Sequence, residues 1–196
     1  MKRTSRAVAL ALRLVLAPSL ALASPLSALA YPTKGVEAAS VCAHDTEGRA
    51  FELTSLRGKR VVLLYEDRAS AAVNEDVKLA LLDHSKRLGR EAPIVGVAVA
   101  DVSAYDFWPA KGAAKRAVRA KARKLGLPIY CDWNGSFREG LSLKKRTTNL
   151  VVLEADGRVL FAAAGTLTEA QKTEVFGLVG YTPPMVSGSA SARSVP

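Results

Sequence analysis

Cysteine and histidine are scarce in this chain of 196 residues, which has two of each. Cys42 and Cys131 are the two cysteines, and no cysteine lies between positions 43 and 130. The sequence therefore contains neither a CxxC nor an HExxH motif, and it also lacks a glycine-rich phosphate loop and a paired acidic cluster. These absences exclude recognisable dithiol, zinc, phosphate and nucleotide sites. We expect no metal, no cofactor and no recognisable catalytic residue.

Long apolar runs are also missing, apart from the N-terminus. Three basic residues within the first six positions precede an Ala- and Leu-rich stretch that ends in Ala28-Leu29-Ala30. This pattern is typical of a signal peptide with a small-residue cleavage site. Arg13, Pro18 and Pro25 interrupt the stretch well before the roughly 20 apolar residues that a membrane anchor needs. We predict that residues 1–30 are a signal peptide cleaved near Ala30, with a periplasmic or secreted mature chain that has no transmembrane span. An uncleaved, anchored form is the alternative.

The charge and composition of the remainder define one domain and a tail. The formal net charge of the chain is +10, and loss of the leader with its four basic residues lowers it to +6. Residues 31–181 are long enough to bury one core. Residues 182–196 are rich in Pro, Ser, Ala and Gly and have no apolar period. We predict a flexible low-complexity tail there.

Hydrophobic patterning predicts an alternation of strands and helices. The run Val61 to Leu64 has no polar interruption, as in a strand covered on both faces. Thr168 with Gln171 three residues later forms a helix-capping box pattern. The predicted elements are a hairpin at 41–53, a central strand at 60–65, a helix at 71–88, a strand at 93–100, a helix at 110–125, a strand at 127–131, a hairpin with strands at 148–154 and 158–163, and a helix after Thr168.

This order of elements resembles that of thioredoxin-like domains. Segments 48–59 and 151–159 resemble motifs of the redoxin and peroxiredoxin branch. Within the superfamily the chain resembles most the YtfJ-type periplasmic proteins, through Asp132, Asn134-Gly135 and Arg138, then through 151–159 and 165–169. The resemblance implies an α/β, thioredoxin-like three-layer fold with a central mixed sheet and an N-terminal β-hairpin extension.

The same resemblance places the usual redox site on residues that cannot exchange disulfides. The two positions of a CxxC pair fall on Ser70 and Val73, and the position of the cis-proline beside that site falls on Thr148. Disulfide exchange needs a thiolate at a helix N-terminus and a second thiol that resolves the mixed disulfide. We interpret Ser70 as the N-cap of the helix rather than as a nucleophile, because His84 would lie roughly 21 Å away along that helix. The candidate degenerate-site cleft comprises Asp67, Arg68, Ser70, Val73, Thr148 and Asn149.

Two alternatives remain open for the charged residues of that cleft and three for the cysteines. Asp67 and Arg68 either line a retained cleft above the strand ends or are solvated loop charges. Cys42 and Cys131 either form a structural disulfide or are buried reduced residues. The third alternative makes Cys131 a lone peroxidatic thiol, which its Tyr-Cys-Asp context disfavours because a neighbouring carboxylate raises a thiol pKa.

The predicted helix at 110–125 is strongly basic and has no acidic residue. It is either a solvated helix or a surface for an anionic partner. Nucleic acid is disfavoured because no interleaved aromatic platform accompanies the charges. The residues of the candidate surface are Lys111, Lys115, Arg116, Arg119 and Arg123.

Together these patterns predict an exported protein without a redox dithiol, a non-catalytic binding or assembly component of the bacterial cell envelope. Its partner would be an unknown envelope protein or an anionic envelope surface. The alternative is a divergent redoxin or peroxiredoxin-like oxidoreductase that uses Cys131.

Overall fold

A computed structural model describes residues 31–89 and 92–183 of the chain. The predicted leader and nearly all of the predicted tail lie outside the described residues. The strands are β1 (Cys42–His44), β2 (Ala50–Glu52), β3 (Arg60–Glu66), β4 (Ile94–Asp101), β5 (Ile129–Asp132), β6 (Asn149–Leu153) and β7 (Val159–Ala164). The helices are α1 (Glu75–Leu88), α2 (Ala110–Leu125), α3 (Ser136–Gly140) and α4 (Glu169–Val179), with 3-10 turns η1 (Leu53–Leu56) and η2 (Ser103–Tyr105).

The strands form one mixed sheet in the order β2-β1-β5-β4-β3-β6-β7. β3, β4 and β5 are parallel, whereas the hairpin β1–β2 and the hairpin β6–β7 add antiparallel pairs at the two sides. The three parallel strands therefore end at the same edge of the sheet, which we call the carboxyl edge. Glu66, Asp101 and Asp132 are the last residues of these strands.

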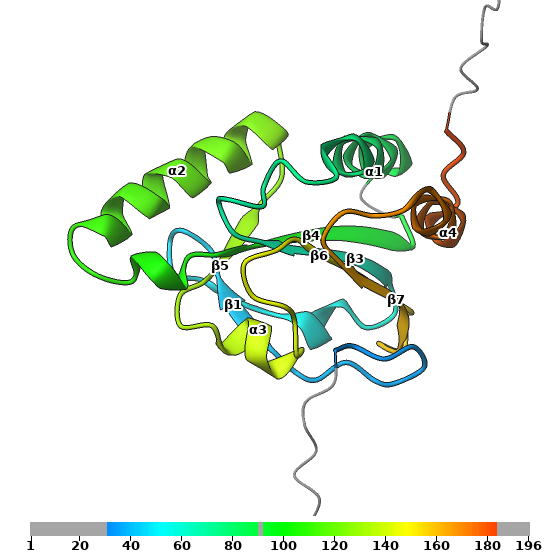
Figure 1. Cartoon of the computed structure of the whole chain (residues 1–196), viewed down its shortest axis with the longest axis horizontal. Helices are drawn as coiled ribbons and strands as arrows, with labels where there is room; N and C mark the ends of the chain where they lie inside the picture. The colour runs from blue at the N-terminus through cyan, green and yellow to red at the C-terminus, as the bar shows by residue number, and fades with distance from the viewer. Residues whose placement is uncertain (1–30, 90–91, 184–196) are drawn as a thin grey trace, which may run out of the picture.

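The apolar run of β3 packs on both faces, as its lack of alternation predicts. Val61 and Leu63 belong to the core under α3 and η1, while Val62 belongs to the core under α1 and α4. Figure 1 shows these layers, with α1 and α4 above the sheet and α3 below it. The predicted three-layer arrangement is confirmed.

Most predicted elements are found close to their predicted bounds, with two corrections. The first helix begins at Glu75 instead of residue 71, because Asn74 has left-handed backbone angles (φ 55°, ψ 35°) that cannot continue a helix. The short helix α3 was not predicted, since five residues are too few to show a helical period. The capping box of α4 is confirmed, with the Thr168 hydroxyl accepting from the Gln171 N–H and the Gln171 side chain accepting from the Thr168 N–H.

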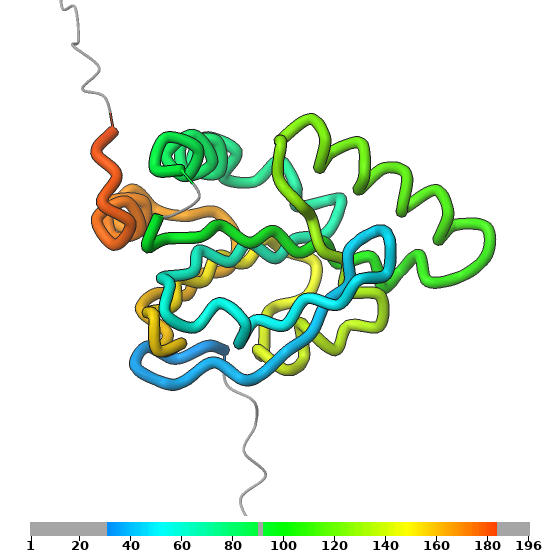
Figure 2. Tube along the Cα trace, turned by 180° about the vertical axis from the view of Figure 1, so that it is seen from behind, coloured from blue at the N-terminus to red at the C-terminus, as the bar shows by residue number. Residues whose placement is uncertain are grey.

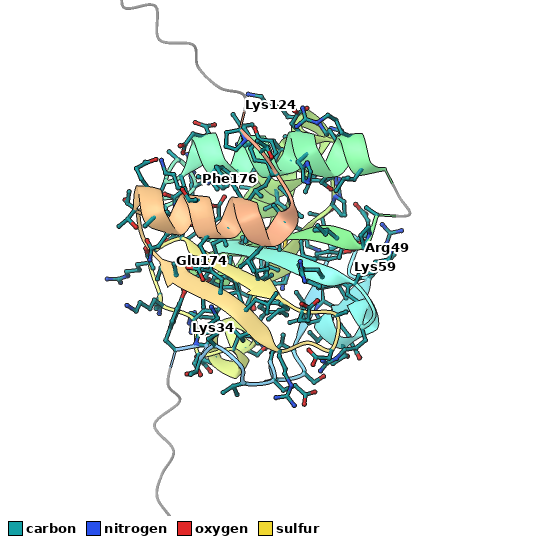
Figure 3. All side chains as sticks on the ribbon, turned by 90° about the vertical axis from the view of Figure 1, so that its right-hand side faces the viewer. Lys34, Arg49, Lys59, Lys124, Glu174 and Phe176 are labelled. Carbon is teal, nitrogen blue, oxygen red and sulfur yellow. The ribbon has the colours of Figure 1, made fainter. Side chains whose placement is uncertain are left out.

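Helix α2 differs from the other long helices because none of its residues is buried. Figures 1 and 2 show it on the side of the sheet that α1 also covers, extending outward from the β5 region. By contrast, α4 lies flat across its face of the sheet (Figure 3), and its Glu174 pairs with Lys34 at 3.3 Å. None of the described helices is long and apolar enough to cross a membrane.

Candidate functional site

The loop between β3 and α1 occupies the position where the resemblance places a dithiol. Ser70 is 6% exposed, and its hydroxyl and backbone N–H both donate to Asp67 Oδ1, at 2.7 and 2.8 Å. The N–H of Val73 donates to the Ser70 carbonyl, closing a turn that precedes the helix. The interpretation of Ser70 as the helix N-cap is therefore wrong, because its side chain closes this loop turn and α1 begins five residues later. Arg68 is exposed at the tip of the loop.

Asn74 attaches the same loop to the connection between β7 and α4. Its side-chain amide donates to the Gly165 carbonyl and accepts from the Leu167 N–H, each at 2.9 Å. These two bonds join segments more than 90 positions apart in the sequence. They fix the backbone of this loop next to Ser70 and Val73, where the resemblance places a dithiol.

Thr148 and Asn149 are fully buried and shape the neighbouring loop. The Asn149 amide bonds to the N–H and carbonyl of Lys144 and to the carbonyl of Thr147, at 2.9 to 3.1 Å. The Thr148 carbonyl accepts from the Gly165 N–H. Asn149 therefore has a structural role in holding this loop, and Thr148 lies where the loop meets the carboxyl edge.

Glu66 ends β3 beside Thr148 and was not singled out from the sequence. Lys78 of α1 donates to Glu66 Oε2 at 2.8 Å and to the Ala71 carbonyl at 2.7 Å. The Thr148 hydroxyl lies 3.5 Å from the same Glu66 oxygen. Burial raises the pKa of Glu66, and the charge of Lys78 opposes that rise.

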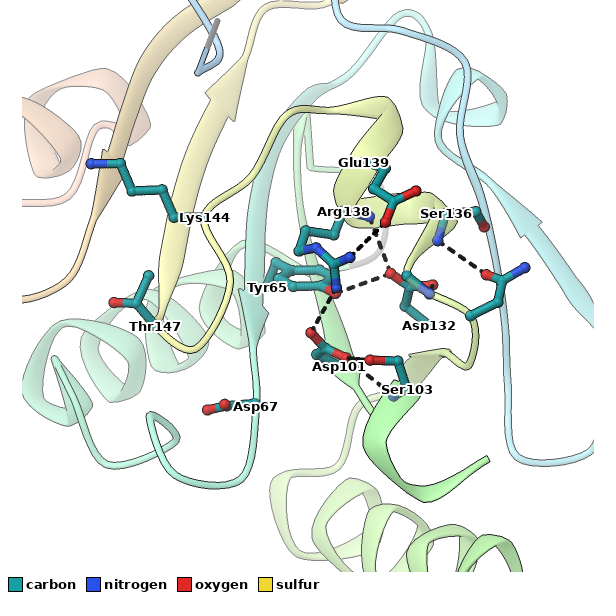
Figure 4. A network of polar contacts seen from close by, with 12 residues as sticks. Tyr65, Asp67, Asp101, Ser103, Asp132, Ser136, Arg138, Glu139, Lys144 and Thr147 are labelled. Atoms are coloured by element: carbon teal, nitrogen blue, oxygen red, sulfur yellow. Dashed lines mark hydrogen bonds and ion pairs between the residues drawn. The ribbon is translucent and has the colours of Figure 1, made fainter. Parts of the chain in front are cut away.

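A second polar cluster at the carboxyl edge joins Tyr65, Asp101, Asp132 and Arg138 (Figure 4). Tyr65 donates to Asp132 Oδ2 at 3.0 Å, and the same oxygen accepts from the Arg138 N–H at 3.1 Å. The Arg138 guanidinium reaches Asp101 Oδ2 at 3.3 Å. All four residues are less than 9% exposed. We call these four residues the buried polar cluster.

Electrostatics within the buried polar cluster favour the ionised form of Asp101. Burial and the nearby charges of Asp132 and Asp101 raise the pKa of the Tyr65 phenol, which stays protonated and donates its hydrogen bond. Burial acts to raise the pKa of Asp101, but hydrogen bonds from Ser103 and Tyr65 and the charge of Arg138 hold it below its usual value. The cluster therefore contains a buried ion pair between Arg138 and Asp101.

The sequence motif that carries the YtfJ-type resemblance belongs to this cluster. Asp132 Oδ1 accepts from the Gly135 N–H at 2.9 Å, so the Asn-Gly turn wraps around the Asp132 carboxylate and leads into Arg138. The partner that sequence reasoning missed is Asp101. The sequence feature that could have revealed Asp101 is an acidic residue at the end of each of two adjacent parallel strands, whose carboxyl ends meet at one edge of the sheet.

The candidate cleft residues are close together only in part. Asp67 and Ser70 contact each other, and Thr148 and Asn149 are adjacent at the start of β6, but a hollow among the described residues lies elsewhere. It is at the opposite end of β3 and includes Arg57, Lys59 and Glu154 among its lining residues. None of the six candidate residues lines that hollow.

Both cysteines are free thiols in the structure. The strand register puts His44, not Cys42, opposite Cys131. Cys131 is 1% exposed, and burial raises its pKa to about 11, with Asp45 adding to the rise and Lys115 opposing it. A thiol in this state is almost entirely protonated at neutral pH, unlike the low-pKa cysteines of peroxidatic sites.

The five residues of the candidate anionic-partner surface on α2 divide into two groups. Lys111 pairs with Asp106 at 2.5 Å and lies 4.9 Å from the Trp133 ring centre, and Lys115 lies 6.0 Å from the same ring. Arg119 pairs with Glu47 at 2.6 Å. Arg116 and Arg123 are exposed and form no ion pair with another described residue. Within residues 31–89 and 92–183, no group of three or more His, Cys, Asp or Glu side chains could hold a metal ion.

Comparison with known proteins identifies the fold. No protein-family model and no curated protein sequence matches the chain. Among solved structures, the exposed lipoprotein thioredoxin Etrx1 of Streptococcus pneumoniae is similar with a TM-score of 0.55 at 15% identity, covering 72% of this chain and 98% of that one. A thioredoxin-family thiol:disulfide interchange protein of Chlorobium tepidum has a TM-score of 0.50 at 14% identity, covering 75% and 97%.

A third match is the thioredoxin domain of a thiol-disulfide oxidoreductase from Bacteroides vulgatus, with a TM-score of 0.50 at 12% identity over 75% of this chain and 98% of that one. At such low identities the likeness concerns the fold alone. The chain thus has a thioredoxin-like α/β fold with a mixed sheet and an N-terminal β-hairpin, as the sequence predicts.

Proposed function

We propose that this protein is an exported, non-catalytic binding or assembly component of the bacterial cell envelope, with a thioredoxin-like fold and no thiol chemistry. One observation carries the proposal. The position of the expected dithiol holds Ser70, buried and hydrogen-bonded to Asp67, and the loop around it is fixed by Asn74. A fixed loop without a thiol has no group that could form a mixed disulfide.

The export half of the proposal is supported by the sequence. A basic N-terminus, an Ala- and Leu-rich stretch and the Ala28-Leu29-Ala30 pattern are typical of a secretory signal. The YtfJ-type resemblance points to the same compartment, and the Asp132 and Arg138 that carry it both belong to the buried polar cluster.

The alternative, an oxidoreductase that uses Cys131, gains no support from the site. Its thiol is 1% exposed, so a substrate disulfide or peroxide could not approach it without movement of the surrounding strands. Its pKa of about 11 leaves very little thiolate at neutral pH. Cys42 is half-buried, and its thiol donates to the Ala43 carbonyl at 3.5 Å.

A reductase assay tests the proposal with a matched cysteine-free variant. The full-length parent and the Cys42→Ala, Cys131→Ala double variant are added to insulin with dithiothreitol, and insulin precipitation is followed over time. We expect both proteins to leave the rate at that of dithiothreitol alone, because neither holds an accessible thiolate. Circular dichroism checks that the variant is folded. Faster precipitation with the parent than with the variant would show that its thiols exchange and would refute the proposal.

A further inference from the structure

Helix α2 has an outer face of exposed basic residues, of which Lys121 is close enough for its charge to act on Glu66. Arg116, Lys121, Arg123 and Lys124 are exposed, and over the described part of the chain none of them forms an ion pair. Lys124 lies at the outer margin of the molecule in Figure 3. We call these four residues the outer basic face.

The remaining basic residues of α2 hold the helix on the domain. Lys111 and Lys115 contact the Trp133 ring, and Arg119 pairs with Glu47. Since these three are engaged on the inner side, the charges of the outer basic face are presented in a fixed direction. At 100° per residue, all four residues of the outer basic face lie at least 80° around the helix from Lys111.

Small side chains separate the charges of the outer basic face. Ala113, Ala117 and Ala120 are exposed, and at 100° per residue they lie between Arg116 and Lys121 around the helix. No acidic residue occurs in α2. Like charges spaced three or four residues apart destabilise a helix, so an anionic surface that neutralises them would stabilise α2.

Two aromatic residues just before α2 are also exposed. Trp108 is 92% exposed and Phe107 is 59% exposed, the two largest values among the exposed large apolar residues of the described chain. Aromatic side chains beside a basic helix are typical of segments that bind at the boundary between lipid headgroups and acyl chains. An acidic protein or polysaccharide would neutralise the charges but offers no such boundary to Trp108.

We propose that α2 docks on the surface of an anionic lipid bilayer, with the outer basic face on the headgroups and Trp108 and Phe107 inserted at the interface. This inference rests on the proposed binding role and names the partner as a lipid surface. The negative surface potential of anionic lipids attracts basic residues that lie near the membrane. This attraction needs no specific pairing, which is consistent with a face that has positive charge only.

A vesicle-binding experiment tests the outer basic face with a charge-matched control. The test variant is Arg116→Gln, Lys121→Gln, Arg123→Gln, Lys124→Gln, and the control is Lys34→Gln, Lys86→Gln, Lys145→Gln, Arg146→Gln, four exposed residues outside α2. The full-length proteins are sedimented with vesicles of phosphatidylglycerol and phosphatidylethanolamine, and with phosphatidylcholine vesicles. All carry the same N-terminal segment, so differences between them report on α2.

We expect the parent and the control to bind the anionic vesicles alike and the test variant to bind at least about 100-fold more weakly, since each basic residue near the surface contributes to the attraction. Raising the salt concentration should release the parent. Equal binding by the test variant and the parent, or equal binding of the parent to both kinds of vesicle, would overturn the proposal.

The fluorescence of Trp108 provides a readout that the N-terminal segment cannot produce, because that segment has no tryptophan. In a Trp133→Phe variant, which keeps a ring beside Lys111, Trp108 is the only tryptophan. We expect its emission to shift to the blue with anionic vesicles and to be quenched by brominated lipids. Binding to heparin or polyaspartate together with no shift on vesicles would overturn the lipid assignment.

The insulin assay measures thiol reactivity, and the vesicle assay measures lipid binding by α2. Failure of the proposed function is therefore distinguishable from failure of the lipid-docking proposal. A redox-active protein could still bind lipid, and a redox-inactive one could fail to bind.

Discussion

Arg138 is the residue on which the buried polar cluster depends. Its guanidinium pairs with the carboxylate of Asp101, and its backbone N–H donates to the carboxylate of Asp132. Removing one partner of a buried ion pair leaves an uncompensated charge, which destabilises a protein far more than loss of an exposed pair does. The cluster therefore stabilises the carboxyl edge only while it is complete.

Replacement of this side chain should be strongly destabilising. We expect Arg138→Met, which keeps the volume and removes the charge, to lower the free energy of unfolding by about 3 kcal/mol in urea denaturation. The control is Arg158→Met, whose exposed pair with Asp156 should contribute less than about 1 kcal/mol. Equal effects of the two substitutions would contradict a stabilising role for the cluster.

The lowered pKa of Asp101 predicts how the free energy of unfolding depends on pH. Its folded-state pKa lies below the unfolded value of about 3.9. The stabilisation it supplies is thus present above about pH 4 and is lost as the pH falls through the folded pKa. We expect the difference in unfolding free energy between the parent and Asp101→Asn to shrink on acidification from pH 6 to pH 3, measured by urea denaturation. For the exposed control Asp156→Asn, the difference in unfolding free energy from the parent should stay below about 0.5 kcal/mol over this pH range. A difference for Asp101→Asn that does not change with pH would contradict this account.

At the level of elements, the loop between β3 and α1 is closed by hydrogen bonds of its own side chains. It has a turn closed by Asp67 and Ser70, then a left-handed residue, Asn74. Asn tolerates left-handed angles better than other residues with a Cβ, and its amide can bond to distant backbone. The loop is consequently bound to the β7–α4 connection through Gly165 and Leu167.

Substitutions of Asn74 separate its backbone and side-chain contributions. Asn74→Ala loses two hydrogen bonds and strains the left-handed position, so we expect a loss of about 2 to 3 kcal/mol. Asn74→Gly loses only the bonds and should be about 1 kcal/mol less destabilised. Hydrogen exchange at Leu167 provides the local readout, because its N–H donates to Asn74 Oδ1.

Asn74→Asp keeps an acceptor and should preserve protection of that amide, whereas Ala and Gly should not. Unchanged protection of the Leu167 amide in all three variants would show that the Asn74 side chain does not hold the two segments together.

For the whole molecule, the sequence predicts the scaffold better than the site. Uninterrupted apolar runs such as β3 and turn residues such as those at 155–157 reveal strands and hairpins, because burial on a sheet requires those patterns. The start of α1 was missed because it depends on the conformation of Asn74. Glu66 and Asp101 were missed because they meet their partners, Lys78 and Arg138, only after the strands align.

The α2 surface was predicted only in outline, for the same physical reason. The run of basic residues is plain in the sequence, but which of them face the domain depends on Trp133 and Glu47, which lie outside the helix. The sequence therefore includes Lys115 and Arg119 in the candidate surface and leaves Lys121 and Lys124 out of it.

The central claim, that this thioredoxin-like domain performs no thiol chemistry, is tested most directly by the reactivity of Cys131. In a full-length Cys42→Ser variant, this thiol is the only one, and its reaction with an aromatic disulfide reagent is timed at pH 8 with and without urea. A pKa of about 11 and 1% exposure predict a reaction at least about 100-fold slower in the folded protein than in the unfolded chain. A folded-state reaction as fast as, or faster than, that of the unfolded chain would contradict the account.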